Sequence, residues 1–152
     1  MTTATLQQTD TINAHVNAAA TSVQALDPKL VARLVARAAA GGAPGVETFA
    51  PATQAKIADM KCKLDAALLL TLRAAWVKGQ GKRFSTEAAV AKLTASEAAM
   101  WITHQAVQIH GGMGVVVGTP VEQLYRDVRA LRIYEGTLEI QRLVIARTLL
   151  KG

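Results

Sequence analysis

Apolar residues recur at intervals of three and four through the middle of the chain, and this spacing limits the possible folds most strongly. The segment from about Ala52 to Lys78 has its apolar positions at Ile57, Met60, Leu64, Leu68, Leu72 and Ala75. Residues with this spacing share one face of an α-helix. We therefore expect one helix about 40 Å long, which Gly79 and Gly81 then end.

A second long helix is predicted to follow. Ser85 or Thr86 can cap it, Glu87 is favourable in its first turn, and it should run to about Ile109. Gly111-Gly112 are expected to end it. Its small residues would let neighbouring helices approach closely, and they are Ala88, Ala89, Ala91, Ala95, Ala98 and Ala99.

The rest of the chain also favours helices. Residues 115–117, three valines, have the composition of a strand but no partner strand, whereas 121–132 and 137–150 are predicted as two shorter helices. Upstream, helices are plausible at 13–25 and from Pro28 onward. The predicted fold class is therefore all-α, an antiparallel helical bundle.

The domain division is expected to fall at a glycine- and proline-containing connector. Residues 41–45 read Gly-Gly-Ala-Pro-Gly, which is typical of a break between helices. We predict a divergent N-terminal helical segment with its linker over residues 1–50, and a bundle domain over residues 51–152.

Composition and charge exclude several function classes. Hydrophobic residues make up 51% and aromatic residues 4% of the 152 residues, which indicates a globular, alanine-rich helical protein. The net charge of +6 comes from scattered lysines and arginines without interleaved aromatic residues, so no nucleic acid is expected as a partner. A single cysteine, Cys62, and widely spaced histidines predict no metal site.

Targeting signals are not evident. The first twenty residues have neither a basic start nor an apolar run, and they contain no arginine. No stretch approaches the roughly 20 apolar residues of a membrane span. We therefore expect a cytoplasmic protein with no membrane span.

Two segments could carry chemistry. The run Gln108-Ile109-His110-Gly111-Gly112-Met113-Gly114 exposes backbone N–H groups that can hold anionic oxygens such as a pyrophosphate. The alternative is an ordinary glycine helix end.

The second segment is Tyr134-Glu135-Gly136, in the turn between the two short helices. If Glu135 is buried there, its pKa rises and it suits proton abstraction, while Gly136 lets a ligand approach the backbone. The alternative is a surface glutamate beside Thr137, with Thr137 as the N-cap of the next helix.

Taken together, these motifs resemble those of one known family. The run from Ile57 to Lys151 is similar to the carboxy-terminal bundle of the acyl-CoA dehydrogenases. The resemblance rests on RAAW at 73–76, EAAVAKLTASEAAM at 87–100, QAVQIHGGMG at 105–114 and LYRDVRALRIYEGTLEIQRLVIARTLL at 124–150. The GGMG form resembles the short-chain members most.

The resemblance implies a reaction and site residues. These enzymes use FAD to make a trans-2-enoyl thioester from an acyl-CoA: a glutamate removes the alpha proton while the beta hydrogen leaves as hydride. Glu135 matches that catalytic base and Gly136 matches a substrate contact. The cofactor-binding residues that the resemblance implies are Gln108, Ile109, His110, Gly111, Gly112, Thr137, Leu138 and Glu139, of which the first five reach the flavin of a neighbouring subunit.

The resemblance also implies parts that this sequence does not include. The family has an amino-terminal helical domain and a middle β-domain, which holds the flavin ring and much of the thioester. We therefore expect the chain to be inactive alone, and to form a homo-oligomer or join a partner chain that carries the β-domain. The alternatives are a non-catalytic assembly module and a truncated relic of the family.

Overall fold

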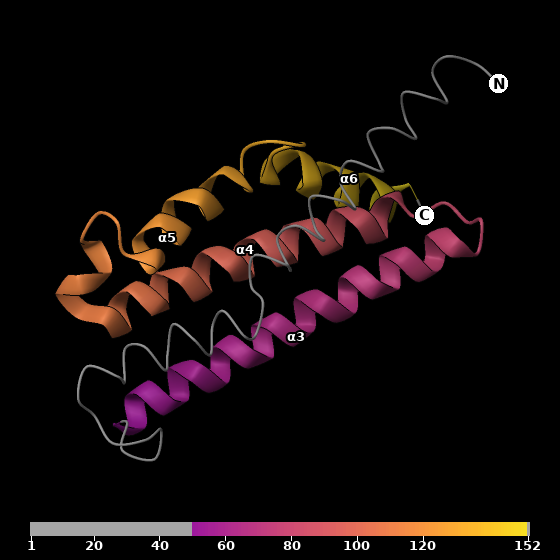
Figure 1. Cartoon of the computed structure of the whole chain (residues 1–152). Coiled ribbons are helices and arrows are strands. Elements are labelled where there is room, and N and C mark those ends of the chain that lie inside the picture. The colour runs from indigo at the N-terminus through magenta and orange to yellow at the C-terminus, as the bar shows by residue number, and fades with distance from the viewer. Residues whose placement is uncertain (1–49, 152) are drawn as a thin grey trace.

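The computed structural model describes residues 50–151, which fold as helices joined by short connections (Figure 1). The elements are α3 (Pro51–Gly79), α4 (Ser85–His110), the 3₁₀ helix η2 (Gly111–Val115), α5 (Pro120–Ala130) and α6 (Leu138–Leu150). Within this described range there is no strand, so the all-α prediction is confirmed. The helices expected at 13–25 and from Pro28 lie outside the described residues.

Helix α4 is the centre of the described structure. It runs antiparallel to α3, and η2, α5 and α6 pack along it, with α5 and α6 returning on the side away from α3 (Figure 1). Of these helices, none is both long and apolar enough to cross a membrane.

The core confirms the predicted role of the small residues. Ala67 on α3 packs against Ala95 and Ala98 on α4, and Ala74 packs against Ala91. Because these side chains are short, the two long helices approach closely over this half of their length. Larger side chains fill the other half, where α5 joins the core, and the buried ones are Met60, Leu64, Ile102, Val128 and Leu131.

Helix α4 begins differently from the prediction. Its N-cap is Phe84, which makes no side-chain capping hydrogen bond, so the predicted capping by Ser85 or Thr86 is wrong. Both hydroxyl residues already lie inside the helix, which begins at Ser85 after three non-helical residues that follow the turn at Gly81. The hydroxyl of Thr86 instead donates to Thr148 Oγ on α6, at 3.0 Å.

The connection after α4 is compact. Val115 ends η2, and Val116 N–H donates to Met113 O, so the valine run forms no strand. Gly114 lies against the backbone of α4: a Cβ added there would be 2.5 Å from Val107 O. Only glycine allows this approach, which fixes η2 on the end of α4.

Candidate active site in the turn before α6

The turn between α5 and α6 has an uncommon backbone conformation. Glu135 has φ of +57° and Gly136 has φ of +81°, so two consecutive residues are left-handed. Such a conformation is ordinary for glycine but costs about 1–2 kcal/mol for other residues. The surrounding contacts must therefore hold Glu135 in place.

Glu135 itself is exposed. The burial considered for it is not seen among the described residues, because the reversal from α5 to α6 lies on the outside of the bundle, and its neighbours Ile133 and Tyr134 are 59% and 44% exposed. The alternative interpretation of this turn holds in its local detail: Thr137 is the N-cap of α6, and its Oγ accepts from Ile140 N–H at 3.5 Å. The carboxylate thus stands beside uncovered apolar side chains.

Two buried polar side chains hold the turn from below. Lys92, on α4, is 0% exposed, and its Nζ donates to Tyr134 O at 2.8 Å and to Gly136 O at 2.7 Å. Gln141, on α6, is also 0% exposed, and its Nε2 donates to Gly136 O at 3.1 Å. Burial lowers the pKa of Lys92, and the negative charge of Glu135 opposes that shift.

Lys92 and Gln141 were not predicted as site residues. A signal for Lys92 exists in the sequence: it stands in register with Ala88, Ala95 and Ala99, a stripe of small residues on the inner face of the helix. A lysine on such a stripe is expected to be buried, and a buried lysine needs acceptors. Gln141 offers no comparable signal.

The residues at the start of α6 differ in what they offer a ligand. Leu138 is 2% exposed as a whole residue, so its side chain faces the core and little of it is open to a cofactor in this chain. Glu139 is exposed, and hydrogen bonds from its own backbone N–H and from the Thr137 hydroxyl lower its pKa. The first N–H groups of a helix lack intrahelical partners and attract negative charge.

The glycine segment lies at the other end of α4. Gly111 is the C-cap, with φ of +56°, so the interpretation as a glycine helix end is confirmed. A Cβ added at Gly111 or Gly112 would meet nothing within 4 Å, which leaves the backbone open to an approaching group. Gln108 is exposed, Ile109 packs on the core, and His110 donates through Nδ1 to Ala106 O at 2.8 Å.

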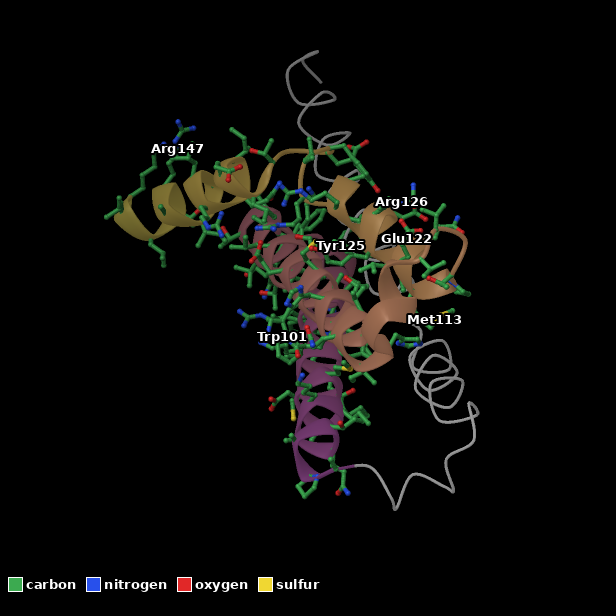
Figure 2. All side chains as sticks on the ribbon, turned by 90° about the vertical axis from the view of Figure 1, so that its left-hand side faces the viewer. Trp101, Met113, Glu122, Tyr125, Arg126 and Arg147 are labelled. Atoms are coloured by element: carbon green, nitrogen blue, oxygen red, sulfur yellow. The ribbon has the colours of Figure 1, made fainter. Side chains whose placement is uncertain are left out.

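The two predicted segments are not brought together within this chain. Lys92, under the Glu135 turn, and Gln108 are separated by 16 residues of one helix, which corresponds to about 24 Å. In Figure 2, Met113 beside the glycine segment and Arg147 on α6 lie on opposite sides of the view. If both segments contact flavin, they contact different flavin molecules.

Each of the two predicted segments offers polar groups that an anionic ligand could reach. Open glycine backbone at Gly111 and Gly112, and the start of α6 with the Thr137 hydroxyl, are the accessible polar groups. Over residues 50–151, no group of three or more His, Cys, Asp or Glu side chains could hold a metal ion.

Comparisons with known proteins agree on one family. Residues 14–150 match the family model described as acyl-CoA dehydrogenase, C-terminal domain. The match begins at residue 14, inside the predicted N-terminal segment 1–50, whereas the motifs that resemble the family begin only at Ile57. The short-chain specific acyl-CoA dehydrogenase of Bos taurus mitochondria is 60% identical over 101 residues, which are 66% of this chain and 24% of that protein. This chain thus spans about a quarter of the length of the curated relatives it matches.

Solved structures are also similar to this chain. Butyryl-CoA dehydrogenase from Megasphaera elsdenii superposes with a TM-score of 0.75 at 35% identity, over 90% of this chain and 36% of that one. PigA with FAD and proline superposes with a TM-score of 0.83 at 29% identity, over 93% of this chain and 37% of that one. Because the family model covers most of the chain, this protein belongs to the acyl-CoA dehydrogenase family, in which it corresponds to the carboxy-terminal domain.

Proposed function

We propose that this domain supplies the general base, Glu135, for FAD-dependent alpha,beta-dehydrogenation of an acyl-CoA thioester. One observation carries the proposal: Glu135 is an exposed carboxylate in a left-handed turn whose backbone carbonyls are held by buried Lys92 and Gln141. An ordinary surface glutamate needs no such support. A fixed carboxylate with one open side suits proton removal from a bound carbon acid.

The open side of the turn fits a thioester chain. Ile133 and Tyr134 are large, uncovered apolar side chains next to the carboxylate, and an alkyl chain lying across them would remove water from both. Gly136 has no side chain to block the backbone beside Glu135. Removing water around the carboxylate would also strengthen it as a base.

Family members are FAD-dependent, and the bound flavin would accept the hydride from the beta carbon. In this chain, the start of α6 would contact the flavin of the Glu135 site through Thr137 and Glu139, while Leu138 is buried beneath them. The glycine segment from Gln108 to Gly112 would contact the flavin of a second subunit. The separation of the two segments along α4 supports this division of roles.

The chain is proposed to depend on a β-domain, supplied by a neighbouring part of the assembly. The alpha proton of a thioester is far too weakly acidic for a carboxylate unless the carbonyl is polarised. The described residues form helices and their connections, whereas the family resemblance assigns much of the thioester binding to a β-domain. We therefore expect no turnover by the isolated 152-residue chain.

A complementation assay tests the proposal. The purified chain is mixed with FAD and a truncated bovine relative that lacks the segment matching this chain, and dye reduction is followed with butyryl-CoA. Turnover should appear only in the mixture, and Glu135→Gln should abolish it. The matched control is Asp127→Asn, which removes an exposed carboxylate from α5. Full activity of the Glu135→Gln mixture would refute the assignment.

A second candidate role is assembly, and a separate observation favours it. Leu69, Leu72 and Trp76 on α3 are 65%, 55% and 63% exposed, although they are large and apolar. Uncovered apolar surface of this kind marks protein interfaces. The two roles are compatible. Association without activity in any mixture would favour the assembly module, and the absence of both would favour a relic.

A further inference from the structure

Lys92 is a charged side chain in surroundings that would ordinarily exclude it. It lies in the first third of α4 at 0% exposure, among the buried alanines Ala88, Ala91 and Ala95. Lysine is rarely buried completely, since removing an ammonium from water is costly unless its donors are satisfied. Its partners therefore indicate why it is there.

All three donors of the ammonium reach backbone carbonyls of one turn. Lys92 Nζ lies 2.7 Å from Gly136 O, 2.8 Å from Tyr134 O and 3.4 Å from Leu131 O. Leu131 is the C-cap of α5, where carbonyls lack intrahelical partners and attract a positive charge. The ammonium thus joins the end of α5 to the start of α6.

The acceptors bracket Glu135. Tyr134 O precedes the left-handed pair and Gly136 O follows it, so the ammonium fixes the orientation of the chain on both sides of the carboxylate. Gln141 Nε2 also donates to the second of these acceptors, Gly136 O. The ion pair from Arg132 to Glu97, at 2.7 Å, ties the chain to α4 three residues before Glu135. Lys92 is therefore the contact that spans the turn.

We propose that Lys92 is a positioning residue. From beneath the site, it holds the backbone turn that directs Glu135 toward its substrate. The ammonium does not touch the substrate or the flavin, and it acts through the carbonyls of Tyr134 and Gly136. The structural part of this proposal stands by itself, and the catalytic part rests on the proposed function.

The structural part is tested by hydrogen exchange in the full chain. Lys92→Met keeps the length and apolar stem of the side chain but removes all donors. The N–H groups of Ile133 and Tyr134 both donate to Ala130 O in the wild type. Their exchange should accelerate about tenfold or more, as expected for the loss of charge-assisted hydrogen bonds. Amides in the middle of α3 should be unaffected.

The matched control is Lys82→Met, which removes the same charge from an exposed position and should leave exchange in the turn unchanged. Unchanged exchange in Lys92→Met would overturn the proposal. If Lys92→Met does not fold, an NMR measurement on the wild-type chain tests the proposal instead. A lysine ammonium that exchanges slowly and shows nuclear Overhauser effects to the Gly136 alpha protons supports the proposal, and the absence of such a signal overturns it.

The catalytic part is tested in the complemented enzyme. Lys92→Met should lower kcat for butyryl-CoA about tenfold to a hundredfold, as expected for a misplaced reacting group, with KM changed little. If Lys92→Met instead weakens assembly and flavin binding and raises KM as much as it lowers kcat, its role is merely structural, and the catalytic part is overturned. If the wild-type mixture has no turnover, the proposed function fails, and hydrogen exchange alone decides the role of Lys92.

Discussion

Replacing Gly114 with alanine should destabilise the fold through one identifiable contact. The added Cβ would lie 2.5 Å from Val107 O and 3.0 Å from Val107 Cα, whereas ordinary contacts begin at 3.4 Å. Both atoms belong to the backbone of α4, so no side-chain rotation can relieve the contact. To restore an ordinary distance, η2 must move by almost an ångström. Overpacking of this size costs about 1–3 kcal/mol. For a domain of about 100 residues, each kcal/mol lowers Tm by about 4–8 °C.

The assay is thermal unfolding followed by circular dichroism, with Gly112→Ala as the control. A Cβ at Gly112 meets nothing within 4 Å, and this residue has no left-handed backbone. Alanine there should leave Tm unchanged or raise it slightly, because the unfolded chain loses freedom. If Gly114→Ala unfolds within about 2 °C of Gly112→Ala, less than the cost of one overpacked contact, the close packing of η2 on α4 is wrong.

Two further predictions concern charge and association. The pKa of Glu139 is lowered from 4.5 by hydrogen bonds from its own backbone N–H and the Thr137 hydroxyl. Its stabilisation should therefore be complete above that ordinary value and disappear as the pH falls through the folded-state pKa. Urea unfolding of Glu139→Gln should show a deficit at neutral pH that vanishes in acid, and a constant deficit would contradict this. The wild-type chain should also self-associate at about tens of micromolar in sedimentation experiments. Leu69→Glu and Leu72→Glu should shift the chain to monomer. The control Ala55→Glu, at another exposed position of α3, should not. A strictly monomeric wild type would contradict the proposed interface.

Most of the fold was accessible from periodicity alone. The helix predicted from Ala52 to Lys78 is α3 (Pro51–Gly79), since its apolar stripe and the following glycines are purely local signals. The alanines of α4 likewise predicted close helix packing, which the Ala67 and Ala95 contact confirms. Capping at Ser85 or Thr86 was not predictable, because the exact entry of the chain into α4 depends on tertiary contacts such as Thr86 with Thr148.

The candidate site was predictable in position but not in construction. The motif around Glu135 identified the turn, yet whether a turn is buried depends on which elements cover it, and no local pattern encodes that. The positive φ of Glu135 was equally hidden, since glutamate rarely adopts it. The alanine stripe indicates that Lys92 is buried, but it does not indicate the partner: Lys92 and Gly136 are 44 positions apart, and such a long-range pair has no periodic signal.

The most direct test of the central claim is removal of the alpha proton itself. Butyryl-CoA is incubated in deuterated water with FAD, the truncated relative and this chain, and deuterium at the alpha carbon is measured by mass spectrometry. The wild-type mixture should incorporate deuterium. Replacing Glu135 by glutamine should slow incorporation by about 100-fold or more, the usual contribution of a general base. Incorporation at the wild-type rate in the Glu135→Gln mixture would contradict the claim that this domain supplies the base.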